Sequence, residues 1–448
     1  MRLQLLCLIL LFCACRKQDA PAPSGPATQR EINNWILANM REYYLWNQSL
    51  PATADGQQEP QAFFNSLKRP GDRFSVIYNE NNFPKGMLRT FGIDYYVIPW
   101  AQAPGGAIGI INFVIPGTAA ALNGLKRGDY FTRISNTVIT AANAQQLGSD
   151  LLQKSKSNIT TAKVAANGQV TEEQQVAIEG RTIVENPLYE KKTWQINGKK
   201  IAYLFLNNFD DYYNNDVLQA FRKFKEEGAT ELIIDLRYNP GGSVTGAALL
   251  SALAAPGLDE LKPFVQYAGN AKQQVRMRSF KDVLAVPSGD NNVIPFSSLA
   301  PGQLSLPRVF ILGTAITGSA AELVINNLKP YMQVVLIGQT TFGKDVGAVS
   351  ITDKRIPWSL VPVTYKLSNA RGEGGYENGI TPQYVSDEKS ILPLFPIADQ
   401  QDPLIAKALS LITGGGRQGQ FERITPTVKV LYDSRQLLSE SSIVILPD

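Results

Sequence analysis

The stretch from Pro307 to Gly347 constrains the fold most, because its pattern passes from strand to helix to strand. Val309 to Leu312 and Val334 to Ile337 are short, apolar, β-rich runs. Between them, Ala320 to Leu328 places apolar residues at helical spacing, and Pro330 ends that helix. This order predicts a right-handed parallel crossover and therefore an α/β fold class.

Two reactive side chains follow the two strands of this crossover. Ser319 comes after the first strand, at the start of the helix, and Lys344 follows the second strand 25 positions later. Functional groups gather beyond the carboxyl ends of such strands, so we expect the pair at one sheet edge. The chain contains no histidine, which excludes a Ser-His-Asp triad, a Cys-His dyad and histidine-ligated zinc.

If Ser319 is a nucleophile, lysine is the known alternative base. A lysine base must be neutral, whereas its ordinary pKa is about 10.4. Lowering that pKa to near 7 costs about 4 kcal/mol, an amount that burial can supply. Phe342 and Val346 flank Lys344 and would help to bury it. The helix that starts at Ser319 would direct free backbone N–H groups at a developing oxyanion.

Other interpretations of these residues stay open at this point. A serine at a helix start is commonly an N-cap, and a lysine in a glycine turn is commonly solvated. Residues 338–344 (GQTTFGK) also fit a phosphate loop. However, Asp345 stands where Mg²⁺ binding needs Ser or Thr, and Val346 to Thr352 alternates like a strand. These two features argue against nucleotide binding.

A second segment, Glu231 to Gly242 (ELIIDLRYNPGG), predicts a buried strand followed by a tight turn. The turn, residues 239–242, leads into a helix from Ala247 to Ala254. The Gly-Gly pair at 241–242 exposes backbone N–H groups with no side chain in the way. Taken alone, the pair is better explained as an ordinary turn.

Three motifs, DLRYNPGG, TAITGSAAELVINNLKP and GQTTFGKDVG, together resemble those of the C-terminal processing peptidases, also called tail-specific proteases. The resemblance implies that Ser319 is the nucleophile and Lys344 the general base. It also implies an oxyanion hole formed by the N–H of Ala320 and that of Gly241 or Gly242. It spans roughly residues 30 to 412.

One position departs from the family pattern. Many members carry a glutamine four residues after the lysine, which orients it, and this chain has Ala348 there. Either another group positions the lysine, or this branch works without that contact. Glu322 lies close in sequence to the serine, but no role is assigned to it.

The start of the chain reads as a targeting segment. An apolar run from Leu3 to Ala14 is too short to span a bilayer, and residues 1–14 fit a signal peptide. Cys15 after a small residue resembles a lipoprotein lipidation site, and 15–29 reads as a flexible tether. We therefore expect an exported bacterial envelope protein, lipid-anchored to a membrane in the periplasm or at the outer membrane. An unlipidated secretory signal is the alternative.

Four further segments follow the tether. Residues 30–86 predict a small helical domain, and 183–413 the catalytic core, in which Ser359 to Leu367 reads as one strand. Residues 87–182 look like a separate β-rich module, and the run PGTAAALNGLKRGDYFTRI in it resembles a PDZ domain. Such domains take an extended peptide as an added strand and hold its carboxylate on backbone N–H groups. No role is assigned to 414–448.

In the β-rich module, a strand is predicted to start at Phe91, and the carboxylate loop would lie near Thr90 to Ile93. The peptide-binding residues would then be Phe91, Gly92 and Ile93. Docking of a partner unrelated to substrate is the alternative for this module.

The net charge of +4 and the lack of a dense basic block do not support nucleic-acid binding. We expect an exported serine endopeptidase that cleaves polypeptides after its PDZ domain binds a C-terminal tail, and that needs no metal or cofactor. The main alternative is a catalytically silent lipoprotein whose PDZ domain binds peptides. A hydrolase of small esters or amides would leave the PDZ domain without a purpose. Oligomeric state is left open.

Overall fold

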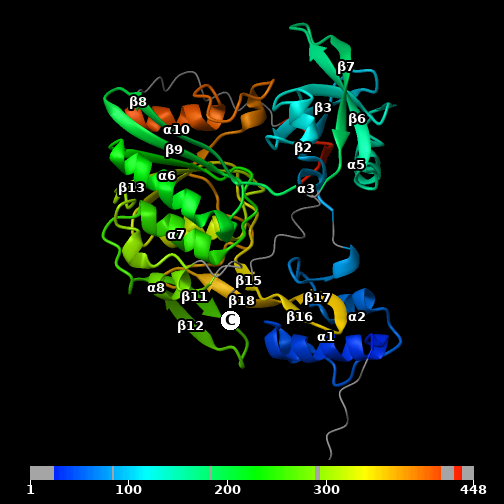
Figure 1. The fold of residues 1–448 in the computed structure, drawn as a ribbon, viewed down its shortest axis with the longest axis vertical. Helices are drawn as coiled ribbons and strands as arrows, with labels where there is room; N and C mark the ends of the chain where they lie inside the picture. The colour runs from blue at the N-terminus through cyan, green and yellow to red at the C-terminus, as the bar shows by residue number, and fades with distance from the viewer. Residues whose placement is uncertain (1–24, 83–84, 182, 288–292, 415–427, 436–448) are drawn as a thin grey trace, which may run out of the picture.

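The computed structural model describes residues 25–82, 85–181, 183–287, 293–414 and 428–435 (Figure 1). Residues 1–24, with the expected signal peptide and Cys15, lie outside the described residues, as does most of 414–448. Figure 1 shows an α/β core, a β-rich domain beside it and a smaller helical module below that domain. The multidomain α/β fold class expected from the sequence is confirmed.

The core sheet is parallel except at one edge. Its described strands run in the order β19-β14-β13-β10-β9-β8, and β8 pairs antiparallel with β9. The β13–α9–β14 crossover is the one predicted, and α9 has the predicted bounds. The strands are β8 (Leu188–Ile196), β9 (Lys199–Leu206), β10 (Glu231–Asp235), β13 (Arg308–Gly313), β14 (Gln333–Gly338) and β19 (Tyr384–Val385).

Helices cover both faces of this sheet. One face packs against α6 (Asn214–Glu226), α7 (Val244–Ala254) and α9 (Ala320–Leu328), while α10 (Pro403–Thr413) packs on the other (Figure 1). Because both faces are covered, the central strands are continuous apolar runs rather than alternating ones. The carboxyl edge of the sheet is therefore where polar groups can gather.

A second, antiparallel sheet runs beside the core in the order β12-β11-β18-β15. Strands β11 and β12 of this sheet form an antiparallel hairpin. The strands are β11 (Pro263–Ala268), β12 (Val275–Ser279), β15 (Val346–Ala348) and β18 (Val363–Ser368), and α8 (Phe280–Leu284) follows the hairpin. The short 3-10 helices are η1 (Asn47–Ser49), η2 (Glu80–Asn82), η3 (Asp211–Tyr213), η4 (Phe296–Ser298) and η5 (Glu388–Ser390).

The N-terminal module is built from two distant parts of the sequence. Helices α1 (Gln29–Tyr43) and α2 (Pro60–Leu67) pack on a sheet of order β1-β17-β16. Strand β1 (Val76–Asn79) pairs with β17 (Ile356–Val361), and β16 (Ile351–Asp353) pairs with β17. The module therefore includes residues that the sequence assigned to the core.

Two expected strands are wrong in the same region. Ser359 to Leu367 is two strands, β17 and β18, which belong to different sheets and are separated by Pro362. The alternating run from Val346 to Thr352 is likewise divided between β15 and β16. Proline has no N–H to donate to a ladder, so a break at Pro362 is favoured.

The β-rich domain is an antiparallel sheet of order β20-β2-β3-β4-β6-β7, with β5 paired to β4. The strand predicted from Phe91 starts at Ile93, because Phe91 ends a short helix. Its elements are α3 (Met87–Phe91), β2 (Ile93–Pro99), β3 (Ala107–Val114), α4 (Ala119–Leu122), β4 (Tyr130–Ile134), β5 (Thr137–Val138), α5 (Ala144–Leu152), β6 (Lys156–Val164), β7 (Val170–Glu179) and β20 (Tyr432–Asp433).

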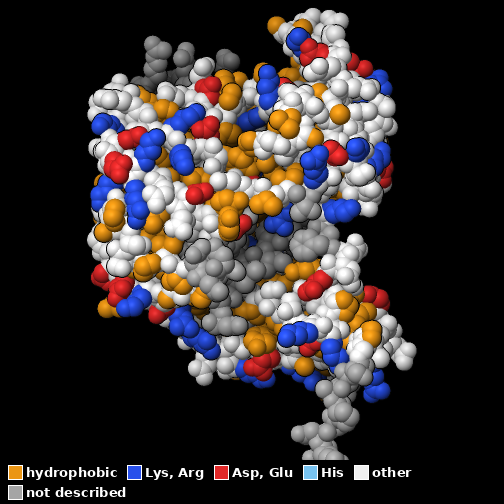
Figure 2. Space-filling model, in the orientation of Figure 1, with side chains coloured by type: hydrophobic (Ala, Val, Ile, Leu, Met, Phe, Trp, Pro, Cys, Tyr) orange, Lys and Arg blue, Asp and Glu red, His pale blue; other side chains and the backbone are white. Residues whose placement is uncertain are grey.

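The surface carries mixed charge. Figure 2 shows Lys and Arg side chains interspersed with Asp and Glu over the visible face, in keeping with the small net charge. Within the described ranges, no helix combines the length and apolar character needed to cross a bilayer.

Candidate active site

Ser319 lies between β13 and α9 in a strained backbone conformation. Its φ of 55° and ψ of −117° lie where residues other than glycine are rarely found. Such strain costs about 1–3 kcal/mol and is typical of functional sites, where the surrounding structure enforces it. The residue is 1% exposed, and its Oγ makes no hydrogen bond to the described residues. Ser319 nevertheless stands at the N-cap position of α9, with Glu322 in the capping-box position.

Glu322 holds the backbones of the two predicted catalytic residues together. Its Oε2 accepts from the N–H of Ser319 at 2.9 Å and from the N–H of Lys344 at 2.8 Å. Its Oε1 accepts from the N–H of Gly343 at 2.7 Å and from the hydroxyl of Thr341. The side chain is fully buried, and this burial raises the pKa of Glu322 although the donors act against the rise. One carboxylate thus holds the segment after β13, which carries Ser319, against the segment after β14, which carries Lys344.

Lys344 is buried, as a lysine base requires. It is 3% exposed, and burial lowers the pKa of Lys344 to about 8, against the carboxylates of Glu322 and Asp72, which raise it. Its Nζ lies 5.6 Å from the centre of the Phe74 ring. That ring meets Phe342 edge to face at 5.8 Å. A substantial share of neutral amine is therefore present near pH 8.

The Gly-Gly turn approaches the serine from the neighbouring strand. A Cβ built on Gly241 would lie 2.6 Å from the Cβ of Ser319 and 3.0 Å from the N of Ala320. The φ of Gly241 is 119°, a value that suits glycine. Its N–H donates to Asn239 Oδ1 at 2.8 Å, while Gly242 lies beside Phe209.

The turn and the serine loop are fixed to each other by further hydrogen bonds. The N–H of Gly318 donates to Asn239 O at 3.0 Å, and Thr317 Oγ1 donates to Leu236 O at 2.7 Å. The structure therefore brings Gly241, Ser319 and Ala320 together at one edge of the sheet.

The N-terminal module covers this site, which the sequence did not predict. The guanidinium of Arg73 donates to the carbonyls of Gly343 at 3.3 Å and Glu377 at 3.1 Å, and it stacks on Phe74. Asp72 Oδ1 accepts from the N–H of Phe74 at 3.0 Å, which shapes this turn. In the sequence the segment shows only a Pro-Gly-Asp turn, so nothing in it indicated contact with the lysine.

The position expected to carry an orienting glutamine offers no polar group. Ala348 is 2% exposed and ends β15. The lysine is instead fixed by the Glu322 contact to its backbone and by the Phe74 ring over its Nζ. Asp345, next to the lysine, is paired with Lys366 at 2.9 Å and is followed by strand rather than helix. The phosphate-loop interpretation therefore fails.

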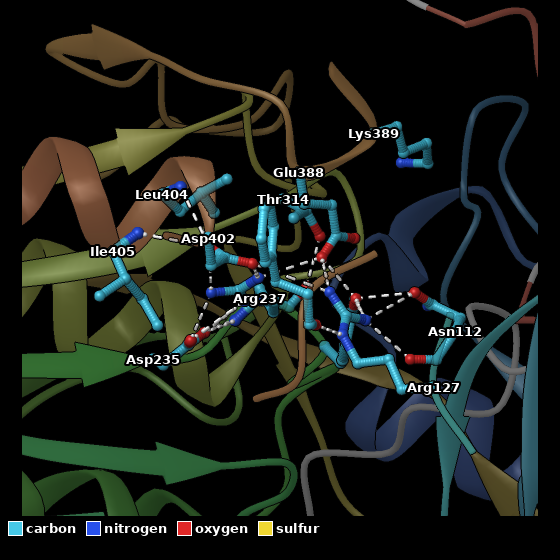
Figure 3. A network of polar contacts seen from close by, with 12 residues as sticks. Asn112, Arg127, Asp235, Arg237, Thr314, Glu388, Lys389, Asp402, Leu404 and Ile405 are labelled. Carbon is cyan, nitrogen blue, oxygen red and sulfur yellow. Dashed lines mark hydrogen bonds and ion pairs between the residues drawn. The ribbon is translucent and has the colours of Figure 1, made fainter. Parts of the chain in front are cut away.

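Buried charges behind the Gly-Gly turn connect the core with the β-rich domain (Figure 3). Arg237 forms ion pairs with Asp235 at 2.8 Å and Asp402 at 2.7 Å. Glu388 Oε2 accepts from Arg237 at 3.1 Å and from Arg127 of the β-rich domain at 2.9 Å. Removing one partner of a buried ion pair costs about 3–5 kcal/mol, so this cluster fixes how the two domains sit.

The predicted peptide-binding residues lie mainly in the core of the β-rich domain. Phe91 and Ile93 are fully buried, and Gly92 is the C-cap of α3. The N–H of Gly92 donates to Leu88 O at 2.9 Å, and that of Thr90 to Gly86 O at 2.9 Å. These two N–H groups are used within the helix, so they are not free to hold the carboxylate of a bound peptide. No cluster of potential metal ligands occurs among the described side chains.

In a comparison with known proteins, two regions of the chain match described families. Residues 200–386, which hold Ser319, Lys344 and the Gly-Gly turn, match the family described as Peptidase family S41. Residues 31–76, which hold most of α1, all of α2 and the turn that covers the lysine, match the Peptidase S41 N-terminal domain. The β-rich domain lies outside both matched ranges.

Among individual proteins, the chain is 25% identical over 270 residues to the carboxy-terminal processing protease CtpA of Bacillus subtilis, covering 60% of this chain and 51% of that protein. It is 24% identical over 231 residues to a carboxyl-terminal-processing protease of Picosynechococcus, covering 51% and 49%. The chain thus spans about half the length of these relatives. A crystal structure of a putative S41 protease from Bacteroides fragilis matches with a TM-score of 0.72 and 29% identity over 85% of this chain and 97% of that one.

Proposed function

Because the chain belongs to peptidase family S41, we propose that it is a serine endopeptidase that cuts polypeptides with a Ser319–Lys344 dyad. Its substrates would be unfolded polypeptides or C-terminal tails. The names of its relatives, carboxyl-terminal processing proteases, support this substrate class.

The proposed mechanism is an acyl-enzyme route. Ser319 Oγ attacks the carbonyl carbon, and Lys344 Nζ takes the hydroxyl proton. The N–H groups of Ala320 and Gly242 stabilise the oxyanion, because the N–H of Gly241 already donates to Asn239 Oδ1. The protonated lysine then gives its proton to the leaving amine, and a water activated by the neutral lysine releases the acyl group.

The burial of Lys344 is the observation that carries this proposal. A solvated lysine would keep an ordinary pKa, whereas burial lowers that of Lys344 to about 8. The strained backbone of Ser319 supports it independently, because a plain helix cap needs no such conformation.

The proposal extends to recognition and location. The β-rich domain would act as the PDZ domain that captures a substrate tail before cleavage. The chain would be exported and anchored to the bacterial envelope through lipidated Cys15. Mass spectrometry of the mature N-terminus tests the second point: an acylated cysteine at position 15 supports it, and an unmodified N-terminus contradicts it.

The test of catalysis compares wild type with Ser319→Ala and Lys344→Ala. Each chain is incubated with an unfolded protein that ends in an apolar tail, and the fragments are read by mass spectrometry. Cleavage by wild type alone is expected. Undiminished cleavage by Ser319→Ala would show that the assigned nucleophile is wrong.

A catalytically silent peptide-binding protein is the second candidate. It is favoured by Ala348 in place of the orienting glutamine and by the lack of a hydrogen bond from Ser319 Oγ to the described residues. Equal tail binding by all three chains, without cleavage by any, would establish it.

A further inference from the structure

The segment 430–435, near the end of the chain, lies on the β-rich domain as an added strand. In Figure 1 it is the red segment beside β2. Strand β20 pairs antiparallel with β2, which places Tyr432 opposite Val97. The N–H of Leu431 donates to Val97 O at 2.8 Å, and the N–H of Ser434 donates to Tyr95 O at 2.9 Å. This is the geometry by which an extended peptide augments a sheet edge.

The segment also fills a groove between β2 and α5. Tyr432 is 3% exposed, and its ring lies 5.7 Å from that of Tyr95. A Cβ built on Gly148 of α5 would lie 2.3 Å from Tyr432 Oη. The helix thus has a glycine where the aromatic ring needs room, so the slot is shaped for a large side chain.

The next contact in the groove is ionic. Arg435 Nε lies 2.5 Å from Asp94 Oδ2, and both side chains are almost fully buried. Ser434 Oγ, between them, accepts from the N–H of Tyr95 at 2.9 Å and donates to Asp94 Oδ1 at 3.2 Å. Burial raises the pKa of Asp94 to about 7 although Arg435 lowers it, so a cation in the groove favours the ionised carboxylate.

Arg435 extends this contact to the catalytic core. Its Nη1 donates to the carbonyl of Tyr238 at 2.9 Å, and its guanidinium lies 4.3 Å from the centre of that ring. Tyr238 directly precedes the turn that approaches Ser319, and its hydroxyl donates to Asn112 of β3 at 2.7 Å. One arginine therefore links the groove with the loop that forms the active site.

We propose that residues 430–435 are a built-in ligand of the β-rich domain, and that the groove they fill binds polypeptides with an aromatic residue followed three positions later by arginine. The occupancy of the groove by residues 430–435 is independent of the function proposed above. The further step, in which substrates displace this segment before cleavage, rests on that function.

The short ladder explains how such a ligand can exchange. Strand β20 has only Tyr432 and Asp433, so it makes few backbone hydrogen bonds. Its binding to the groove therefore depends on the Tyr432 ring and on the ion pair of Arg435 with Asp94. A competing peptide that supplies the same two side chains would regain both contacts. A peptide without the arginine would leave Asp94 buried and unpaired, which is unfavourable.

The test measures binding to full-length chains that all carry Ser319→Ala, so the result does not depend on cleavage. The probe is a fluorescein-labelled synthetic peptide with the sequence of residues 428–435, followed by anisotropy. We expect Arg435→Ala to bind it at least tenfold more tightly than the parent, because the internal segment is weakened. Arg435→Lys keeps the charge beside Asp94 but loses the separate donor to Tyr238, so its affinity should lie between those of the parent and Arg435→Ala.

A second variant, Tyr432→Ala with Arg435→Ala, should bind the probe still more tightly. Circular dichroism checks that each chain is folded; if the double variant is not, Arg435→Ala alone decides. Equal affinity of Arg435→Ala and its parent would overturn the proposal. So would equally tight binding of a control peptide in which alanine replaces the tyrosine and the arginine, or a lack of binding by every folded chain.

Discussion

The burial of Lys344 predicts how cleavage depends on pH. With its pKa at about 8, about one tenth of the lysine is neutral at pH 7 and about nine tenths at pH 9. If only the neutral amine accepts the serine proton, kcat/KM rises about tenfold over this interval and levels off above about pH 9. A lysine at its ordinary value of 10.5 would give a rise of about a hundredfold without a plateau.

The assay is kcat/KM for a quenched-fluorescence peptide between about pH 6 and pH 10, at constant ionic strength, which reports the free enzyme. Circular dichroism over the same range confirms that the fold persists. A flat profile between about pH 6 and pH 9 would refute lysine as the base.

Asp72→Asn extends the same prediction. The carboxylate of Asp72 raises the pKa of Lys344, so its removal should move the profile to lower pH. Asparagine retains an oxygen to accept from the N–H groups of Phe74 and Ser75, which preserves the turn. Asp353→Asn, an exposed carboxylate in β16, is the matched control and should leave the midpoint unchanged. A midpoint that rises in Asp72→Asn would contradict the electrostatic argument.

Three other substitutions have defined outcomes. Ser319→Gly should be more stable than Ser319→Ala by about 1 kcal/mol in urea unfolding, because glycine tolerates the φ of 55°; equal stability would argue against strain. Gly241→Ala should lower kcat by about 100-fold or more in the peptide assay, since its Cβ would lie 2.6 Å from that of Ser319; normal kcat would exclude the turn from the oxyanion site. Lys344→Met should be more stable than wild type by up to about 3 kcal/mol at pH 7. That advantage should shrink between about pH 8 and 10.5. In this range the unfolded wild type binds more protons than the native wild type, so wild-type stability rises with pH. A difference in thermal stability between the two chains that does not change with pH would contradict this.

The local parts of the site followed from the sequence. Helix α9 has the predicted bounds, because its apolar spacing and the proline that follows it are local signals. The crossover then placed Ser319 and Lys344 at one sheet edge, and Glu322 confirms their proximity by bonding both backbones.

The contacts between distant segments could not be predicted from the sequence. Phe74 covers a lysine 270 positions away, and no local pattern encodes such a pairing. Glu322 fits the capping-box position after Ser319, a pattern that marks a helix start but is silent about Gly343 and Lys344. Strand β20 is too short to be recognised without its partner β2.

The interleaved N-terminal module has a consequence for biosynthesis. Leu360 of β17 is fully buried in the same cluster as Ile36 of α1, so the module lacks part of its core until that strand has been made. At about 5–20 residues per second, the ribosome needs about 15–60 s to travel from α1 to β17. During that interval the turn with Phe74 has no stable support. The cover over Lys344 therefore forms late in synthesis, only after β17 has been made.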